Sequence, residues 1–254
     1  MDEGGMLKGK RIIVTGAAQG IGAALATGFA GMGAKVALAD IADPSDAAAR
    51  IVEAGGEAIA VQMDVTRRAD CDRMATETEA AFGGIDGLVN NAALFATLPI
   101  AAYDDIDEGL WDKVMAVNVK GPWLCTGAAV PAMERAGGGS VVMIATNRIF
   151  HGFPGMLHYD ASKGAVLAMA RSLTRELGPK NIRVNTIAPG LTMSEGVLAR
   201  EGIQERKGAI AAGRALARDQ QPEDLIGAVA YFLSDHAGFV TGQSLGVDGG
   251  GIIH

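Results

Sequence analysis

The chain has 254 residues, of which 49% are hydrophobic and 20% charged, which allows a large buried core and excludes an intrinsically disordered chain. Its formal net charge of -7 argues against binding to nucleic acid or to an anionic membrane surface, because both attract clustered Lys and Arg. Its two cysteines, Cys71 and Cys125, are too few for a disulfide framework, and no apolar run is long enough to cross a bilayer. With the polar N-terminus, these features predict a cytoplasmic protein.

Apolar, strand-like runs alternate along the chain with segments of helical period. Such alternation predicts βαβ units around a parallel sheet, and nearly continuous apolar strands are expected where helices cover both faces. Right-handed crossovers then give a doubly wound α/β sandwich of three layers, in a single domain over residues 1–254. The predicted strands are residues 11–15, 35–40, 57–64, 87–91, 140–146, 182–188 and 243–248. The predicted helices are residues 20–32, 45–53, 67–82, 107–135, 158–177 and 222–233.

The segment 190–214 stands apart from this regular pattern. Glycines recur through it among small and polar residues. A segment of this length between core elements is usually functional, so we expect a substrate flap; the alternative is an ordinary helical hairpin on the surface.

A glycine-rich stretch, TGAAQGIG at residues 15–22, follows the first predicted strand and opens the first predicted helix. Gly16, Gly20 and Gly22 permit a tight turn and a close approach of the backbone to a pyrophosphate. The helix N-terminus adds unpaired N–H groups and a partial positive charge, which attract phosphate. The stretch therefore predicts a dinucleotide site rather than a plain turn.

Asp40 ends the second predicted strand, where a carboxylate can accept hydrogen bonds from both ribose hydroxyls of NAD. The same negative charge repels the 2′-phosphate of NADP. Neither Gln19 nor Ile41 is basic, so no side chain here would pair with an extra phosphate. We therefore expect NAD as the cofactor; the alternative role of Asp40 is a helix cap. Asp64 and Asn90 end the next two strands and are expected at the same ligand-binding edge.

Tyr159 and Lys163 are four residues apart on a predicted helix and so share one face. A free phenol has a pKa of ~10, too high to supply much phenolate at neutral pH. A nearby ammonium and the positive charge of NAD⁺ both favour the phenolate; lowering the pKa by ~3 units takes ~4 kcal/mol. Such a phenol can take a proton from an alcohol as hydride leaves, or return it in reduction. Alone, this spacing is typical of an ordinary helix surface, so the interpretation depends on context.

The context is a resemblance that covers nearly the whole chain. The stretches TGAAQGIG, NNAA, VNVKG, YDASK, NTIAPG and TGQSLGVDGG, with Asp40 and the pair Asp64-Val65, resemble the classical short-chain dehydrogenase/reductase family. The resemblance implies a Rossmann-type sheet of seven strands, a nicotinamide cofactor and a homotetramer. It also implies that Tyr159 is the acid and base, and that Lys163 holds the nicotinamide ribose and lowers the pKa of the phenol. Asn118 would kink its helix and keep a relay water near Lys163.

Three positions depart from the family pattern. Thr146 stands where the family has Ser, 13 residues before the Tyr; it keeps a hydroxyl, although its methyl group restricts χ1 and crowds the site. We expect Thr146 to work, with Asn147 as a fallback donor. Ala93 replaces a Gly beside the cofactor path, a small cost unless its φ is positive. The nicotinamide-carboxamide contact falls on Ser194, where Thr is usual, with Thr192 as a second candidate.

The resemblance thus implies three sets of site residues and no metal ligands. The catalytic set is Tyr159, Lys163, Thr146 and Asn118. The cofactor set is Gly16, Gln19, Gly20, Ile21, Gly22, Asp40, Ile41, Asp64, Val65, Asn91, Ala92, Ala93, Tyr159, Lys163, Pro189, Gly190, Thr192 and Ser194. The substrate set is Thr146, Arg148, Phe150, His151, Phe153 and Tyr159.

The predicted substrate pocket is mostly apolar, which suits a hydrophobic or cyclic secondary alcohol and its ketone. Arg148 and His151 either bind an anionic or polar group of the substrate or belong to a solvated loop. By the resemblance, the 190–214 flap closes this pocket, and its other walls are Phe95, Phe150, Phe153, Met156 and Leu157.

The sequence therefore favours hydride transfer between NAD(H) and a small secondary alcohol or ketone. A 3-oxoacyl-[acyl-carrier-protein] reductase is the alternative within the class, which the absence of basic residues around Asp40 disfavours. A non-catalytic nucleotide-binding sensor on the same scaffold is the alternative outside it. Thr146 permits the sensor, whereas the intact Tyr, Lys and Asn disfavour it.

Overall fold

Seven parallel strands form one sheet within residues 5–252, the part of the chain that the computed structural model describes. Their order across the sheet is β3-β2-β1-β4-β5-β6-β7, which confirms the predicted doubly wound, Rossmann-type architecture. The bounds of the strands are β1 (Arg11–Thr15), β2 (Lys35–Asp40), β3 (Glu57–Gln62), β4 (Gly87–Asn90), β5 (Gly139–Ile144), β6 (Ile182–Pro189) and β7 (Ser244–Val247).

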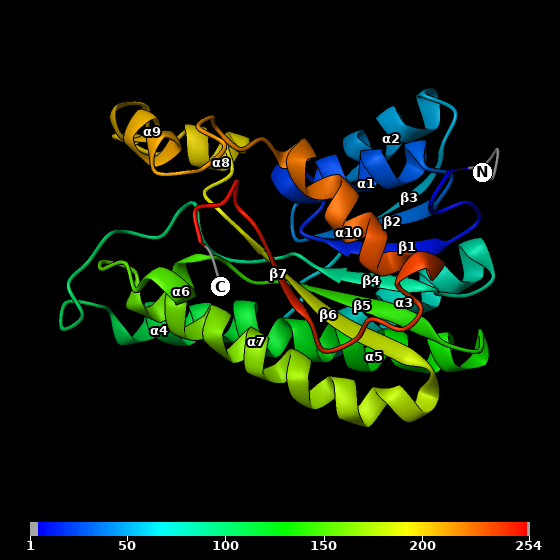
Figure 1. Ribbon diagram of the computed structural model, residues 1–254. Coiled ribbons are helices and arrows are strands. Elements are labelled where there is room, and N and C mark those ends of the chain that lie inside the picture. Colours follow the sequence, from blue (N-terminus) through cyan, green and yellow to red (C-terminus); the bar gives the residue numbers. More distant parts are fainter. Residues whose placement is uncertain (1–4, 253–254) are drawn as a thin grey trace.

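Helices cover both faces of the sheet and complete three layers (Figure 1). One face carries α1 (Gly20–Gly31), α2 (Ser45–Glu53) and α10 (Ile226–Leu233). The other face carries α3 (Arg68–Phe82), α5 (Gly121–Arg135) and α7 (Leu157–Leu177). The shorter helices lie toward the carboxyl ends of the strands; they are α4 (Glu108–Met115), α6 (Arg148–His151), α8 (Glu195–Leu198) and α9 (Ile203–Ala212).

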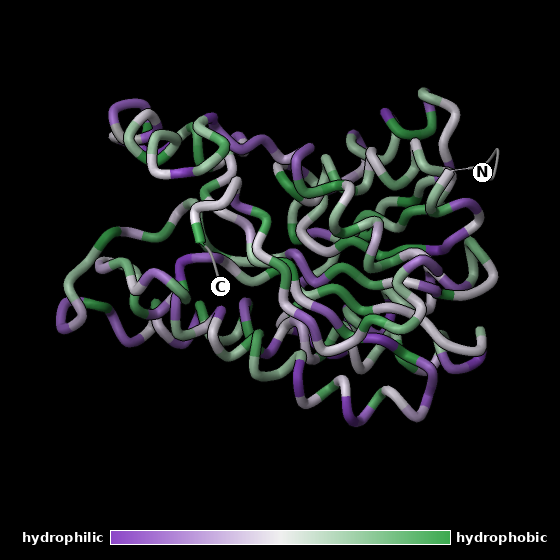
Figure 2. Tube along the Cα trace, viewed as in Figure 1, coloured by the Kyte–Doolittle hydropathy of each residue, from purple (hydrophilic) through white to green (hydrophobic). Residues whose placement is uncertain are grey.

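Each face of the sheet has its own hydrophobic core, because successive strand residues point to opposite faces. In β1, Ile13 packs under α3, α5 and α7, whereas Ile12 and Val14 pack under α1, α2 and α10. Cys71 and Cys125 lie in the first core as free thiols. Figure 2 shows the central strands as hydrophobic and the outer turns and loops as largely hydrophilic. Among the helices of residues 5–252, none combines the length and apolar character that a membrane span requires.

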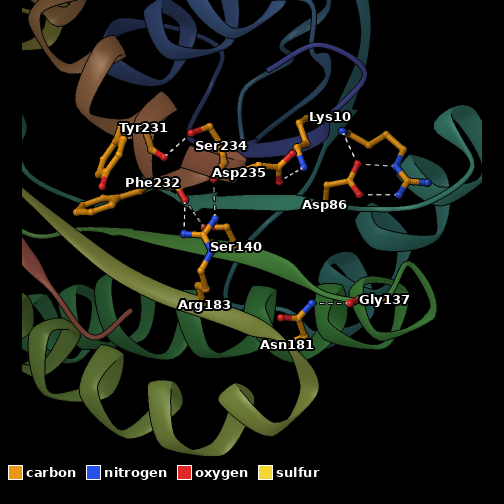
Figure 3. A network of polar contacts seen from close by, with 11 residues as sticks. Lys10, Asp86, Gly137, Ser140, Asn181, Arg183, Tyr231, Phe232, Ser234 and Asp235 are labelled. Carbon is orange, nitrogen blue, oxygen red and sulfur yellow. Dashed lines mark hydrogen bonds and ion pairs between the residues drawn. The ribbon is translucent and has the colours of Figure 1, made fainter. Parts of the chain in front are cut away.

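Polar contacts close the amino end of the sheet (Figure 3). Arg183 of β6 donates to the carbonyl oxygens of Phe232 (2.7 Å) and Ser234 (3.1 Å), where α10 ends. Ser140 of β5 donates to the same Phe232 oxygen at 2.8 Å. These bonds satisfy carbonyls that a helix C-terminus leaves unpaired, so they fix α10 on the sheet at the edge opposite the strand carboxyl ends.

Side chains also clamp the carboxyl ends of β1 and β4, between which the strand order reverses. Asn91 Nδ2 donates to the carbonyl oxygens of Thr15 (2.9 Å) and Gly16 (3.0 Å). Thr15 Oγ1 accepts from the backbone N–H groups of Asn91 and Ala92, each at 3.1 Å. Such a switch point is where open α/β sheets bind ligands.

Three elements differ clearly from the sequence-based prediction, and one of them is β5, which ends at Ile144 rather than at residue 146. The third strand ends at Gln62 rather than at residue 64, because the Asp64 carboxylate accepts bonds from the Thr66 amide and hydroxyl (both 2.8 Å) and turns the chain. The helix expected over 107–135 is interrupted, since Ala116–Lys120 form a π-helical turn between α4 and α5. Pro122 has no N–H to donate to the carbonyl of Asn118, four residues earlier, which favours the wider turn.

The 190–214 segment contains helices α8 and α9 and has a small core of its own. Met193, Val197 and Ile203 are buried together and pack against Phe95. Arg214, at the end of the segment, donates to the carbonyl oxygen of Leu191 (2.7 Å) and so closes the segment at its base.

We expect Gly22→Ala to destabilise the fold far more than Gly31→Ala, although both glycines lie in α1. A Cβ at residue 22 would collide with the carbonyl oxygen of Gly16, whereas at residue 31 it would meet nothing within 4 Å. Overpacking at residue 22 should lower the free energy of unfolding by about 1–3 kcal/mol. Ala in place of an unconstrained helical Gly at residue 31 should instead raise it by about 0.5–1 kcal/mol. Denaturant unfolding measures both; equal stabilities would contradict the close approach at residue 22.

Candidate active site

The carboxyl ends of the strands and the 190–214 segment enclose a cavity of about 1790 Å³. Every residue of the three predicted site sets lines this cavity except Gly22, Asn118 and Phe150. The glycine loop and Asp40 follow β1 and β2, whereas Thr146 follows β5, which lies beyond β4 in the sheet, and Tyr159 and Lys163 lie on α7. Within residues 5–252 no three His, Cys, Asp or Glu side chains come together as metal ligands.

The glycine loop forms a cradle that larger residues would fill. Gly16 and Gly20 have φ values of +66° and +60°, in the left-handed region that favours glycine. A Cβ on Gly16 would lie 2.7 Å from the Cα of Ala92, so only glycine fits between the ends of β1 and β4. Helix α1 begins at Gly20, which puts its unpaired N–H groups at this end of the cavity. This arrangement fits a phosphate-bearing ligand.

The backbone orients Asp40 at the wall of the cavity. Its Oδ2 accepts from the Ala18 N–H (2.9 Å), and its Oδ1 accepts from the Ala42 N–H (3.0 Å). A carboxylate offers about four acceptor sites, so capacity remains for a ligand. No basic residue accompanies Asp40 among the described residues that line this end of the cavity.

The other departures in the cofactor set carry little strain. Ala93 is outside the left-handed region, so its Cβ costs no backbone strain. Thr192 donates from its hydroxyl to the carbonyl oxygen of Gly190 (3.1 Å). Ser194 precedes α8 without a side-chain cap, which leaves its hydroxyl unused by the helix.

Tyr159, Lys163 and Thr146 form one buried group that lines the cavity. Lys163 Nζ lies 5.9 Å from the centroid of the Tyr159 ring and donates to the carbonyl oxygen of Ile144 (2.7 Å). Thr146 follows the end of β5, and its hydroxyl is near enough to the phenol to lower the pKa of that group. The Arg148 N–H donates to Thr146 Oγ1 at 3.3 Å and so orients that hydroxyl. The group is 3–7% exposed, so water is largely excluded from it.

Burial controls the protonation of these groups in the protein alone. It raises the pKa of the Tyr159 phenol above its usual value, and the nearby Thr146 hydroxyl opposes this shift only in part. Burial also lowers the pKa of the Lys163 ammonium to about 8. Desolvation is the largest influence on the phenol in the protein alone, so the expectation that Lys163 and NAD⁺ together lower its pKa stays a prediction.

Asn118 lies outside the cavity, where its side-chain amide is fully engaged. Oδ1 accepts from the Leu94 N–H (2.7 Å), while Nδ2 donates to the Leu94 carbonyl (3.2 Å) and to Ser162 Oγ (3.0 Å). The amide thus joins the loop after β4 to α7. The predicted helix kink is present as the π-helical turn, whereas the relay water stays a prediction.

Arg148 is held by the protein itself. Its Nε and Nη2 bind the two carboxylate oxygens of Asp160 at 2.8 and 3.0 Å, and Nη2 also reaches the Phe153 carbonyl at 3.2 Å. A bidentate ion pair uses the guanidinium charge, which disfavours Arg148 as a reader of anionic substrates. Asn147, expected as a fallback donor, instead donates to Asp248 Oδ2 at 3.0 Å.

The aromatic wall differs from the prediction at one residue of the substrate set. His151 and Phe153 line the cavity with their rings stacked at 4.6 Å. Phe150 is 41% exposed and does not line the cavity. Leu157 is also exposed and does not line the cavity either. Successive residues of a helix point about 100° apart, so with His151 toward the cavity, Phe150 in α6 turns away.

Sequence reasoning missed Arg200, which lines the cavity from the turn between α8 and α9. Its guanidinium lies over the ring of Phe95, and Phe95 in turn packs against Tyr159. The glycine-rich segment around Arg200 has no periodicity that could have indicated this contact.

The chain is similar to known proteins over most of its length. Residues 16–251 match the family model described as "Enoyl-(Acyl carrier protein) reductase". An "Uncharacterized oxidoreductase" of Thermotoga maritima is 36% identical over 96% of this chain and 97% of the relative. A "2-(S)-hydroxypropyl-CoM dehydrogenase 3" of Xanthobacter autotrophicus is 35% identical over 96% and 97% of the two chains.

A solved structure agrees with these sequence matches. A putative short-chain alcohol dehydrogenase of Sinorhizobium meliloti has a TM-score of 0.88 and 32% identity, over 96% of both chains. The chain therefore belongs to the short-chain dehydrogenase/reductase family and is an oxidoreductase of that family. Dehydrogenases of this family typically bind a nicotinamide cofactor.

We expect Lys163→Met to stabilise the protein in the absence of ligands. The folded-state pKa of about 8 lies below the ~10.4 of an unfolded lysine, so the unfolded state binds more protons between these values. Burial of the Lys163 ammonium therefore lowers the free energy of unfolding. This loss is absent above pH ~10.4, grows as the pH falls, and is complete below pH ~8, where it amounts to about 3 kcal/mol.

Denaturant unfolding of the wild type, of Lys163→Met and of an exposed control, Lys8→Met, tests this at pH 7 and pH 9.5. The gain from Lys163→Met should shrink at the higher pH, and the control should show no such trend. A Lys163→Met variant less stable than the wild type at pH 7 would contradict the expected cost.

Proposed function

We propose that this chain is an NAD-dependent dehydrogenase that interconverts a secondary alcohol and its ketone. The observation that carries the proposal is the buried group of Tyr159, Lys163 and Thr146 that lines the cavity, with the Lys163 ammonium 5.9 Å from the centroid of the Tyr159 ring. The glycine loop, which leaves no room for a Cβ at Gly16, lines the same cavity. Together they suit proton transfer beside hydride transfer.

The residues at the glycine loop fit NAD. Gly16 and Gly20 would lie along the pyrophosphate, and the remaining acceptors of Asp40 would receive the ribose hydroxyls. At the nicotinamide end of the cofactor, Thr192 and Ser194 would contact the nicotinamide carboxamide. When bound, NAD supplies the hydride acceptor and a positive charge at its nicotinamide ring.

Tyr159 would handle the proton. Its phenol would take the alcohol proton during oxidation and return it during reduction, while the Thr146 hydroxyl holds the substrate oxygen. Lys163 would hold the nicotinamide ribose. Since burial opposes the phenolate, Lys163 and the nicotinamide charge must act together to bring the pKa of the phenol down.

The substrate is proposed to be hydrophobic or cyclic. Phe95, Phe153 and Met156 line the cavity beyond Tyr159, and Arg148 is paired with Asp160. We also propose that the 190–214 segment is the substrate flap of a single-domain enzyme; the apolar contact of its core with Phe95 supports this. The closing of such a flap would keep water away from the reacting atoms.

The description of the matching family model shares only the acyl-carrier-protein substrate with the 3-oxoacyl-[acyl-carrier-protein] reductase alternative, because an enoyl reductase acts on a carbon–carbon double bond. This alternative is disfavoured by Asp40, because such an enzyme is expected to use NADPH. The sensor alternative would show cofactor binding without turnover.

We propose a homotetramer in the cytoplasm. Large apolar side chains exposed on the monomer support assembly: Trp123 on α5 is 51% exposed, and Leu245 on β7 is 42% exposed. The two buried free thiols suit a reducing compartment.

Tyr159→Phe should abolish turnover, whereas Thr146→Ser should retain it and Thr146→Ala should lose about 10²-fold or more, as expected when an oxygen-directed donor is removed. NADH absorbance with a panel of secondary alcohols and ketones measures this, with Tyr231→Phe on α10 as the control. Turnover that survives in Tyr159→Phe would refute the proposed function. An unchanged rate in Thr146→Ala would exclude Thr146 as the donor.

NAD should give a higher kcat/KM than NADP by about 10-fold or more, equal to ~1.4 kcal/mol. The physical reason is repulsion between the Asp40 carboxylate and a 2′-phosphate. Asp40→Ser should narrow this preference, while Asp43→Ser, which removes the same charge three residues later, should not. Side-by-side kinetics that favour NADP in the wild type would overturn the cofactor assignment.

A further inference from the structure

The ring of Phe95 is shared by the proposed flap and the buried phenol. It lies 4.8 Å from the ring of Tyr159, centroid to centroid, at an interplanar angle of 42°. It packs against the cluster that contains Tyr159 and also against the small core of the 190–214 segment. Any movement of that segment away from the cavity must therefore uncover one side of Phe95.

Arg200 fastens the segment to Phe95 through both the ring and the backbone. Its Cζ lies 5.4 Å from the centroid of the Phe95 ring. Its Nη1 donates to the Phe95 carbonyl (3.0 Å), and its Nη2 donates to the Leu98 carbonyl (3.1 Å). Only the planar fork of a guanidinium can stack on a ring and bond two carbonyls at once; an ammonium is a point charge.

The loop after β4 is thus held at two places. Asn118 binds both backbone groups of Leu94, and Arg200 binds the carbonyls of Phe95 and Leu98. The Phe95 ring contacts both the Arg200 guanidinium and the Tyr159 ring. An aromatic neighbour of the Tyr159 ring is therefore itself bound by a residue of the flap.

We propose that Arg200 is a positioning residue that latches the 190–214 segment onto Phe95 and thereby holds Phe95 against Tyr159. The inference rests on the proposed function for its kinetic consequences. Substrate entry requires the latch to open, and a closed latch keeps the phenol dry and fixed beside the substrate oxygen.

Cleavage of the segment tests the latch without any substrate. A glutamate-specific protease can cut after Glu201 and Glu205, and none of the substitutions below removes these sites. Arg200→Met and Arg200→Lys should be cut about tenfold faster than the wild type, since local opening becomes easier. Arg175→Met, an exposed arginine near the end of α7, is the matched control and should not change the rate. Equal cleavage of Arg200→Met and the wild type would overturn the latch.

Kinetics then test the coupling to Tyr159. With a neutral secondary alcohol, Arg200→Met should lower kcat/KM by about 10- to 100-fold while the KM for NAD stays within about twofold, because the reacting groups lose their positions and the cofactor end does not. Phe95→Leu should lower kcat/KM by a similar factor. The kcat/KM of the double variant should be no lower than that of the less active single variant. Losses that simply multiply would show that the two residues act separately and would sink the proposal.

Arg200→Lys separates the latch from direct recognition of a substrate charge. A latch predicts that Lys fails to restore activity on neutral alcohols. A loss confined to anionic alcohols and restored by Lys would make Arg200 a substrate reader and overturn the latch. If the wild type turns over no alcohol at all, the proposed function fails, while the cleavage rates still decide whether the latch exists.

Discussion

The side-chain amide of Asn118 is the constraint on which the arrangement of the site depends. It bonds both backbone groups of Leu94 and the hydroxyl of Ser162, so three segments distant in sequence meet at one buried residue. Ser162 in turn donates to the carbonyl of Tyr159, one turn earlier in α7 (2.7 Å). The π-helical turn at Ala116–Lys120 places the amide between the loop after β4 and α7. These bonds hold the backbone of Leu94, which precedes Phe95, and the backbone carbonyl of Tyr159.

The buried group of Tyr159 and Lys163 shows a conflict between stability and chemistry. Burial opposes the charged form of each side chain, which raises the pKa of the phenol and lowers that of the ammonium. The protein alone therefore favours a neutral phenol. An added positive charge at the open side of the ring changes that balance by more in this dry group than it would in water, because charges interact more strongly at low dielectric. The same burial that weakens the fold thus makes the group responsive to a cationic ligand.

The sequence was sufficient for features that depend on local pattern. Continuous apolar strands, glycines at a strand–helix junction and the four-residue spacing of Tyr159 and Lys163 are read directly from neighbouring residues, and the observed sheet and cavity agree with them. Features that depend on tertiary partners were not predictable. Arg148 is a free cation in sequence, and only the fold brings Asp160 to its guanidinium. Phe150 is apolar, as expected of a pocket residue, yet its position in α6 turns it away from the cavity. Arg200 bonds residues about 100 positions earlier in the chain.

Thr146 in place of Ser is consistent with the same chemistry when its neighbours are considered. A serine hydroxyl samples three rotamers, whereas the methyl group of threonine restricts χ1. Here the Arg148 N–H donates to Oγ1, and the Arg148 side chain is itself fixed on Asp160, the residue that follows Tyr159. The Thr146 hydroxyl and the residue after Tyr159 are thus both bonded to Arg148. Threonine therefore keeps the donor and reduces its freedom. Under the proposed function, the extra methyl group would act on the size of the substituents that the site admits rather than on the proton transfer.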